Sequence, residues 1–376
     1  MATTTTTRDP LTVSAVLCVD TEGLDRLGAA LRYLAIGLVD QAVQVRLLSA
    51  DARVGGLMLG PIQTLVHEPL VWPLARRRLR YISDVLAAQP PTVVHALCGG
   101  SYALAGALAA EFDADLLLSV SSPADARRLT TMDRKPVQRF LVATAPLLEL
   151  LEAQVGIAHD ALELVRPGIL ARKEVACFAE PGRAPTILCP AGFHRGSGVD
   201  RLIAAVGLLR RRDPQRRVLL FLPGEGPREP ALRRQVDQCG IKPYVTFVHP
   251  LDDLAAALRS ADVFVEPAGT SGFAITPLQA MAAGLAVVTG PNDACDLFHD
   301  GRTALVCPDP DPEALADTIG RLLADPAFSR ELGAAAQEYV RTHHATSAMA
   351  ERTAALYREL ALARATFRLA DAATGT

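Results

Sequence analysis

Short apolar runs alternate with longer amphipathic stretches along most of the chain. In the first half the runs are rich in valine and leucine, and the stretches between them repeat apolar residues at helical spacing, as in 24–41. Such runs are typical of buried parallel strands, and the amphipathic stretches are typical of the helices that connect them. We therefore predict strands at 11–19, 43–49, 92–97 and 115–120.

The same alternation begins again in the second half. Strands are predicted at 185–190, 216–224, 244–250, 261–267 and 285–290, with helices around 201–211, 230–239 and 251–259. Two successive series of this kind predict an α/β protein of two facing, doubly wound, Rossmann-like domains. Ligands of open α/β sheets bind at the carboxyl ends of the strands, so a cleft between the domains is the expected site.

Breaks in this pattern divide the chain. Residues 1–10 are polar and rich in threonine, which predicts a disordered lead-in. Proline and glycine interrupt every regular pattern in 167–184, which we interpret as a hinge. The hinge separates an N-terminal domain over 11–166 from a C-terminal domain over 185–345, and a last helical segment follows at 346–376.

Charge and cysteine content argue against several classes of protein, among them nucleic-acid-binding and disulfide-rich proteins. The 376 residues carry 38 lysines and arginines and 41 acids, a net charge of −3, whereas a nucleic-acid-binding protein normally shows a clear basic excess. The seven cysteines form no CxxC pair, which argues against a disulfide framework or zinc site and favours a reducing cytoplasm. No apolar stretch reaches the ~20 residues that a membrane-spanning helix needs.

Three segments of the second half resemble one family of enzymes. They read ADVFVEP at 261–267, SGFAITPLQAMAAGLAVVTG at 271–290 and HDGRTALVCPDPDPEALADTIGRLLADP at 299–326. In order and spacing they resemble the retaining, nucleotide-sugar-dependent glycosyltransferases of the GT-B fold, the glycosyl transferases group 1 type. The resemblance implies a nucleotide sugar as co-substrate, no metal and no other cofactor. It also implies a C-terminal helix that returns toward the N-terminal domain.

The second of these segments has the features of a phosphate site. Gly269, Ser271 and Gly272 follow a predicted strand, and Pro277 lies in the first turn of the next helix. Backbone N–H groups at such a loop and helix start attract anions, which suits the diphosphate of a nucleotide sugar. The resemblance places Ser271, Gly272 and Phe273 at the sugar and phosphates. The plainer interpretation is a turn between strand and helix.

The donor motif is nevertheless degenerate. The family carries two glutamates here, separated by seven residues, where this chain has Ser271 and Gln279. Gln279 can still hydrogen-bond a ribose hydroxyl, whereas Ser271 is too short to replace a carboxylate. Gly192 and Ser197 occupy the places of an arginine and a lysine that neutralise the departing diphosphate. Either Arg195 supplies that charge from a shifted position, or it is a solvated loop residue.

The remaining candidate positions carry weaker signals. Gly23 lies where the family has a glycine-rich loop on the acceptor side, and Ser121 lies where members often have a histidine. His95 ends a predicted strand, where it either faces the cleft or is bonded to backbone. Gly224 follows another strand, either close to the nucleotide or in an ordinary turn.

A basic amphipathic stretch at 71–89 combines a leucine and isoleucine stripe with four arginines. It predicts either a helix packed on the sheet or a peripheral contact with an anionic membrane.

Two functions follow from the whole sequence. The first is a cytoplasmic glycosyltransferase that moves a hexosyl group from a nucleotide sugar to an acceptor, which is a glycan, a lipid or a small molecule. The second is an inactive pseudo-glycosyltransferase that binds a partner glycosyltransferase or a glycan. It is suggested by the joint loss of the expected polar residues at Gly192, Ser197, Ser271, Gln279 and Ser121.

Overall fold

The computed structural model describes residues 12–57, 60, 62–69, 74–180, 182–251, 253–269 and 272–374, the last seven without their side chains. The expected lead-in at 1–10 and the candidate Ser271 lie outside these residues. The chain divides into two compact units. The first unit consists of 1–168 together with 346–376, and the second consists of 169–345.

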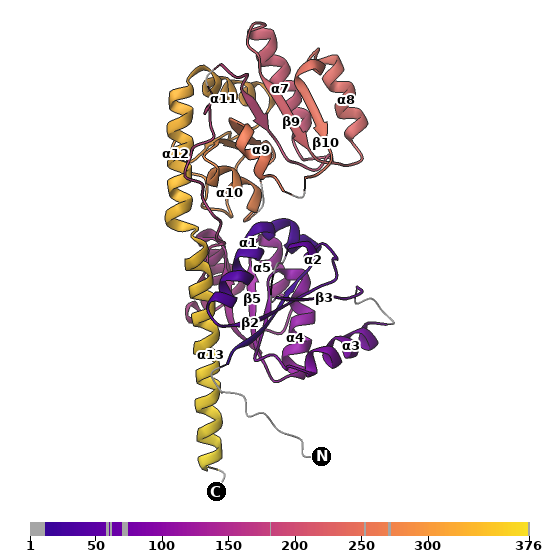
Figure 1. Ribbon diagram of the computed structural model, residues 1–376, viewed down its shortest axis with the longest axis vertical. Coiled ribbons are helices and arrows are strands. Elements are labelled where there is room, and N and C mark those ends of the chain that lie inside the picture. Colours follow the sequence, from indigo (N-terminus) through magenta and orange to yellow (C-terminus); the bar gives the residue numbers. More distant parts are fainter. Residues whose placement is uncertain are drawn as a thin grey trace. The chain divides into compact units, whose positions relative to one another are not determined.

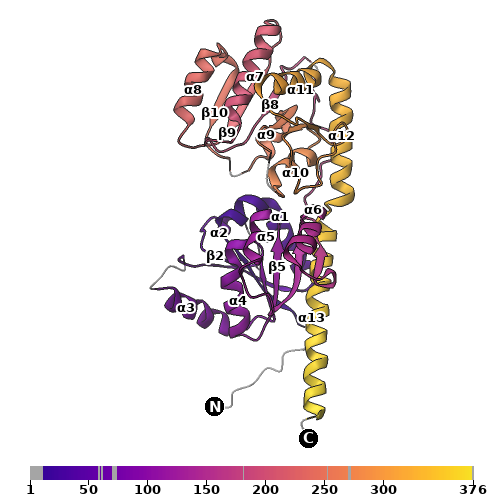
Figure 2. The same cartoon turned by 180° about the vertical axis from the view of Figure 1, so that it is seen from behind.

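The first unit is a parallel sheet with helices on both faces. Its strand order is β3-β2-β1-β4-β5-β6-β7. Helices α1 and α13 lie along one face and α3 and α4 along the other (Figures 1 and 2). The elements are β1 Ser14–Val19, α1 Thr21–Asp40, β2 Gln44–Ser49, α2 Val54–Leu57, β3 Gln63–Val66, α3 Ala75–Ala87, β4 Val93–Ala96, η1 Gly99–Ser101, α4 Tyr102–Glu111, β5 Asp115–Val120, α5 Pro123–Leu129, β6 Val137–Val142, α6 Ala145–Leu150, η2 Leu151–Val155, η3 His159–Ala161, β7 Leu162–Leu164 and α13 Thr346–Thr374.

The second unit repeats this architecture with a six-stranded parallel sheet of order β10-β9-β8-β11-β12-β13. Its apolar core lies between the sheet and helices α7, α8 and α11. Helices α9, α10 and α12 also pack on its strands. The elements are β8 Thr186–Leu188, α7 Val199–Arg212, β9 Leu219–Pro223, α8 Glu229–Gln238, η4 Lys242–Tyr244, β10 Val245–Val248, α9 Ala255–Ser260, β11 Val263–Glu266, α10 Ile275–Ala282, β12 Ala286–Thr289, β13 Leu305–Val306, α11 Pro312–Ala324 and α12 Pro326–His343. The expectation of two Rossmann-like domains is therefore confirmed.

Three strands of the first unit were not expected from the sequence. Strand β6 reads VQRFLV, so Gln138 and Arg139 interrupt its apolar character. Strands β3 and β7 have only four and three residues and lie at the two edges of the first sheet. Short edge strands are half exposed, and they lack the continuous apolar run that marks a buried parallel strand.

The last helix belongs to the first unit because its early turns cross α1 closely. A Cβ atom added at Gly37 of α1 would lie 2.5 Å from the Cβ of Ala350, so only glycine permits this approach. Two turns further along α13, the buried Tyr357 hydroxyl lies 2.6 Å from Nδ1 of His95 on β4. Small residues thus hold α13 close to α1, and its polar contacts with the strands include this one and the ion pairs Arg352–Glu163 at 2.7 Å and Arg364–Asp115 at 3.1 Å.

The basic stretch forms α3, a helix that packs one face on the unit. Ile82 and Leu86 are buried, whereas Tyr81 and Val85 are exposed. Among the described residues, no helix has both the length and the apolar character that spanning a membrane requires.

We predict that Tyr357→Phe destabilises the first unit by about 1–3 kcal/mol. The substitution leaves a nitrogen of His95 buried without its hydrogen-bond partner, which costs that much in typical proteins. Urea denaturation measures the change. The matched control is Tyr81→Phe, whose hydroxyl is exposed and whose effect should stay within about 0.5 kcal/mol. Equal stability of the two variants would contradict the prediction.

Candidate functional site

The strand order of the second unit creates a switch point between β8 and β11. The chain runs outward from β8 to β9 and β10 on one side, and from β11 to β12 and β13 on the other. The loops after β8 and β11 therefore leave the sheet in opposite directions, and ligands of open α/β sheets bind in the crevice that this opens. We define the donor-side site as the loops 189–198 after β8, 267–269 with 272–274 after β11, and 290–292 after β12.

The loop after β8 is fixed by backbone contacts with the loop after β9. Phe193 is fully buried, and its N–H donates to the carbonyl oxygen of Glu225 at 2.8 Å. A Cβ atom at Gly224 would lie 2.1 Å from the carbonyl oxygen of Ala191, and one at Gly226 would lie 2.5 Å from that of Phe193. Gly224 thus supports the loop that carries the site.

The tip of the loop after β8 is a tight, exposed turn. The Ser197 hydroxyl donates to the carbonyl oxygen of His194 at 3.1 Å, and Gly198 adopts a left-handed conformation immediately before α7. Arg195 is exposed in this turn. Gly192 is exposed as well, and a Cβ atom there would lie 2.8 Å from the His194 ring. Gly192, Arg195 and Ser197 therefore lie in one loop, as expected.

The loop after β11 is held by the loop after β12. Asn292 binds Gly272 through two hydrogen bonds, Nδ2 to the carbonyl oxygen at 3.0 Å and Oδ1 from the amide at 3.4 Å. A Cβ atom at Gly269 would lie 2.5 Å from the carbonyl oxygen of Pro291. The positive φ of both Gly269 and Gly272 is readily adopted only by glycine.

The other candidates of this segment differ in exposure. Phe273 is buried, and its ring stacks on His344 with centroids 6.5 Å apart. Its side chain therefore anchors the loop. Gln279 is half buried in the second turn of α10, two residues after Pro277. Ser271 lies outside the described residues.

Two charged residues of this site were missed by the sequence analysis. Arg201, in the first turn of α7, places Nη2 3.4 Å from the carbonyl oxygen of Pro267. Glu266 ends β11, and its Oε2 atom is buried without a hydrogen-bond partner among the described residues. A signal was present for Glu266, since an acid directly after the apolar run ADVFV is unusual for a buried strand.

Burial dominates the electrostatics at this strand end. It raises the pKa of Glu266 from its ordinary value of 4.5 to about 7. Burial, and secondly the charge of Glu266, raise the pKa of the neighbouring Cys189 thiol. The site therefore contains a carboxyl group that is present in both ionisation states at neutral pH.

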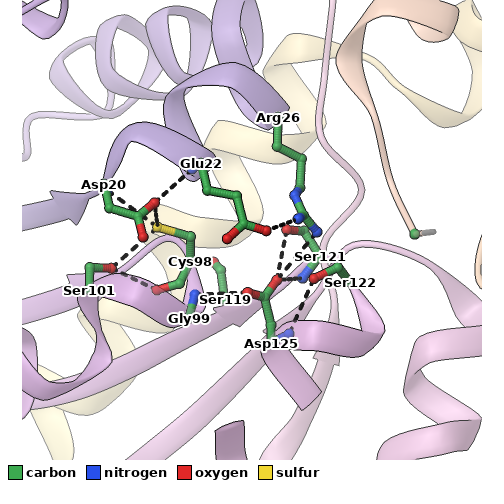
Figure 3. A network of polar contacts seen from close by, with 12 residues as sticks. Asp20, Glu22, Arg26, Cys98, Gly99, Ser101, Ser119, Ser121, Ser122 and Asp125 are labelled. Atoms are coloured by element: carbon green, nitrogen blue, oxygen red, sulfur yellow. Dashed lines mark hydrogen bonds and ion pairs between the residues drawn. The ribbon is translucent and has the colours of Figure 1, made fainter. Parts of the chain in front are cut away.

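The first unit has its own switch point between β1 and β4, where a polar network occupies the carboxyl ends (Figure 3). Asp125 accepts hydrogen bonds from the amide of Gly99 at 2.8 Å and from both the amide and the hydroxyl of Ser121 at 3.0 and 3.1 Å. Arg26 of α1 adds an ion pair with Asp125 at 3.8 Å. The hydrogen bonds of Ser121 with Asp125 therefore help to hold the loops after β4 and β5 together.

The start of α1 packs against the loop after β4. Asp20 caps the helix by accepting from the amide of Gly23 at 2.7 Å, and the thiol of Cys98 donates to the same oxygen at 3.0 Å. A Cβ atom at Gly23 would lie 2.6 Å from the sulfur of Cys98. Gly23 is therefore required for close packing, whatever its role toward an acceptor.

His95 has both ring nitrogens in hydrogen bonds, with Tyr357 at 2.6 Å and with the hydroxyl of Ser119 at 2.8 Å. Burial lowers its pKa to about 3, so the ring is neutral at physiological pH. This supports a structural role. The ring also contributes to the wall of an apolar pocket within the first unit, together with Leu31, Leu34, Leu141 and Met349.

We predict that Gly224→Ala destabilises the second unit by about 1–3 kcal/mol, because the new methyl group forces the 189–198 loop to move. Gly106→Ala on α4 is the control, since the nearest atom to its Cβ would be 4.0 Å away. That variant should be unchanged or stabilised by about 0.5–1 kcal/mol. Urea denaturation of both variants checks the prediction, and a Gly224→Ala protein as stable as the wild type would contradict it.

We also predict that His95 makes the first unit sensitive to acid. A histidine whose pKa is lowered by folding contributes full stability above its unfolded pKa of about 6.5 and loses it as the pH falls toward 3, by up to ~1.4 kcal/mol per pH unit. The free energy of unfolding of His95→Asn should therefore decline less between pH 7 and pH 5 than that of the wild type. Identical slopes would overturn this prediction.

Comparison with known proteins agrees with this geometry. Residues 184–325 match the family model of glycosyl transferases group 1. A GDP-mannose-dependent alpha-(1-6)-phosphatidylinositol monomannoside mannosyltransferase of Mycolicibacterium smegmatis is 31% identical over 225 residues. That match covers 57% of this chain and 58% of the relative, so the chain spans little more than half of the relative's length.

Solved structures resemble nearly the whole chain. A glycosyltransferase from Rickettsia africae has a TM-score of 0.76 at 14% identity, over 93% of this chain and 98% of that one. Anabaena HepE in complex with UDP-glucose has a TM-score of 0.72 at 13% identity, over 91% and 98%. At such identities the likeness concerns the fold. The segment 184–325 thus matches the glycosyl transferases group 1, and the chain as a whole has the GT-B fold of two Rossmann-like domains.

Proposed function

We propose that this protein is a glycosyltransferase that moves a hexosyl group from a nucleotide sugar to a glycan, lipid or small-molecule acceptor. The observation that carries the proposal is the coincidence of the family match with the donor-side site, since all three of its loops lie within residues 184–325. The named relative uses GDP-mannose, and HepE was solved with UDP-glucose. These two nucleotide sugars are therefore the first donors to test.

The donor-side loops are suited to a diphosphate. Gly192, whose backbone is exposed, and the left-handed Gly198 lie in the loop between the carboxyl end of β8 and the start of α7. In this proposal the N–H groups of this loop and of the start of α7 bind the diphosphate. Gln279 is assigned to the ribose. In this proposal Arg195 and Arg201 supply the positive charge that the departing diphosphate requires.

The two arginines differ in how they are held. Arg195 is on an exposed turn, whereas Arg201 is fixed by its contact with the carbonyl oxygen of Pro267. A cation held in place before the reaction stabilises developing charge without reorganisation. Arg201 is thus the better-placed substitute for the cations absent at Gly192 and Ser197.

Isothermal titration of the full chain with GDP, UDP, GDP-mannose and UDP-glucose tests the proposal. We expect one nucleotide series to bind. Arg201→Gln and Arg195→Gln should each weaken that binding about 10-fold, equivalent to ~1.4 kcal/mol, since a hydrogen bond to a charged group is worth ~1.5–3 kcal/mol. Arg234→Gln, an exposed arginine on α8, is the matched control. If none of the four compounds binds, the donor assignment fails.

Turnover separates the enzyme from the pseudo-glycosyltransferase. Release of the nucleoside diphosphate at ordinary enzymatic rates of ~1–10³ per second, with a suitable acceptor, would establish the enzyme. Binding without turnover would favour the inactive form. In that case a variant carrying Gly192→Arg, Ser197→Lys, Ser271→Glu and Gln279→Glu shows whether the four exchanges account for the missing activity.

A further inference from the structure

Glu266 differs from Asp125 and Asp262, two other acids with buried carboxylate oxygens. Asp125 and Asp262 are each nearly fully buried, and both oxygens of each accept hydrogen bonds. The amides of Phe178 and Thr186 donate to Asp262 at 2.7 and 2.8 Å. Within the part of the chain that the structure describes, Oε2 of Glu266 has no such partner, although that atom is buried. Asp125 and Asp262 thus hold neighbouring segments together with both of their carboxylate oxygens in hydrogen bonds.

A buried polar atom without a partner is costly, and native proteins retain very few of them. Each such atom requires an explanation, and a ligand that supplies the missing hydrogen bond is one. Glu266 as a residue is only partly buried, and it lies at the carboxyl end of β11, where the loops of the donor-side site begin. Its position therefore permits contact with a bound molecule.

The position of Glu266 coincides with the centre of the donor-side site. It is the last residue of β11, one of the two strands that flank the switch point. Its carbonyl oxygen accepts from the amides of Gly269 at 3.2 Å and Gly290 at 3.1 Å, so the loops after β11 and β12 both turn at this residue. All three donor-side loops begin beside it.

The charges around Glu266 limit which part of a ligand it can bind. From β8 the thiol of Cys189 lies close enough to be affected by its charge, and from α7 Arg201 contacts the next residue, Pro267. The facing ends of β12 and α10 contain no titratable side chain. A carboxylate repels a diphosphate and accepts hydrogen bonds from hydroxyl groups, so the diphosphate lies toward Arg201 and a neutral polyol toward Glu266.

We propose that Glu266 binds a hydroxyl group of the hexosyl part of the nucleotide sugar and thereby selects the sugar end of the donor. This inference rests on the proposed function, because it needs a nucleotide sugar in the donor-side site. It assigns the recognition of the sugar to the strand end, and that of the diphosphate to the loops and Arg201.

The proposal predicts a pH dependence whose sign is fixed. Only the ionised carboxylate accepts a hydrogen bond at both oxygens, so binding of the sugar favours the ionised form. Because burial holds the pKa of Glu266 at about 7, the affinity for the nucleotide sugar should rise as the pH increases from 6 to 8. If only the ionised form binds the sugar, the rise approaches ~10-fold, the change in the ionised fraction of a group with that pKa.

The experiment is isothermal titration of wild type and Glu266→Gln with GDP-mannose and UDP-glucose at pH 6, 7 and 8, and with GDP and UDP at pH 8. Glutamine has the same shape and does not titrate. We expect the variant to bind the nucleotide sugar about 10-fold more weakly than wild type at pH 8 and to lose the rise with pH. Its affinity for the nucleoside diphosphate should stay within about twofold of wild type. Glu331→Gln, an exposed acid on α12, is the control for the substitution.

The outcomes separate this inference from the proposed function. An equal loss for nucleotide sugar and nucleoside diphosphate, or a pH dependence that persists in Glu266→Gln, overturns the role of Glu266 and leaves the glycosyltransferase intact. Failure of all four compounds to bind wild type overturns both. Folding of the variant is checked by thermal unfolding at pH 8, where it should be at least as stable as wild type because it lacks the buried charge. If the variant does not fold, a flat wild-type pH profile by itself refutes the proposal.

Discussion

Close contact between backbones is the constraint on which the donor-side site depends. The loops after β8, β9, β11 and β12 touch through main-chain atoms at Gly224, Gly226 and Gly269, where a single methyl group would overlap a carbonyl oxygen. Packing of this density leaves one arrangement of the loops. It fixes the exposed backbone around Gly192 and the buried Gly272, and it determines where Arg201 and Glu266 lie relative to the strand ends.

The two units use their switch points differently. In the first unit the acid at the switch point, Asp125, is saturated with hydrogen bonds, and His95 is bonded at both nitrogens. These groups stabilise the fold. In the second unit Oε2 of Glu266 is buried without a hydrogen-bond partner among the described residues, and the side chain of Arg201 contacts the carbonyl oxygen of Pro267 in the neighbouring loop. The polar groups at the first switch point therefore stabilise the fold, whereas those at the second switch point are still able to bind a ligand.

A binding site can keep charged residues even when the residues of its sequence motif have been replaced. Ser271, Gln279, Gly192 and Ser197 lack the charges that the resembling family carries, yet the same crevice contains an arginine from the first turn of α7 and an acid from the end of β11. A nucleotide sugar requires positive charge near its diphosphate and acceptors near its hydroxyl groups. Residues at several positions around one switch point can supply the positive charge or the hydrogen-bond acceptors, because the loops converge there.

The sequence by itself determined the two series of strands and helices, the two Rossmann-like units and the location of the family motif, because these follow from apolar periodicity and from local turn residues such as Gly272 and Pro277. It also placed Gly192, Arg195 and Ser197 in one loop. It missed β3, β6 and β7, whose short or polar-interrupted runs carry no clear period. Only the tertiary structure decided that His95 and Ser121 are held by internal hydrogen bonds, that Phe273 is buried, and that Arg201 and Glu266 lie at the donor-side site. The physical reason is that burial and hydrogen-bond saturation depend on partners far away along the chain, as between His95 and Tyr357, and periodicity along one segment contains no information about them.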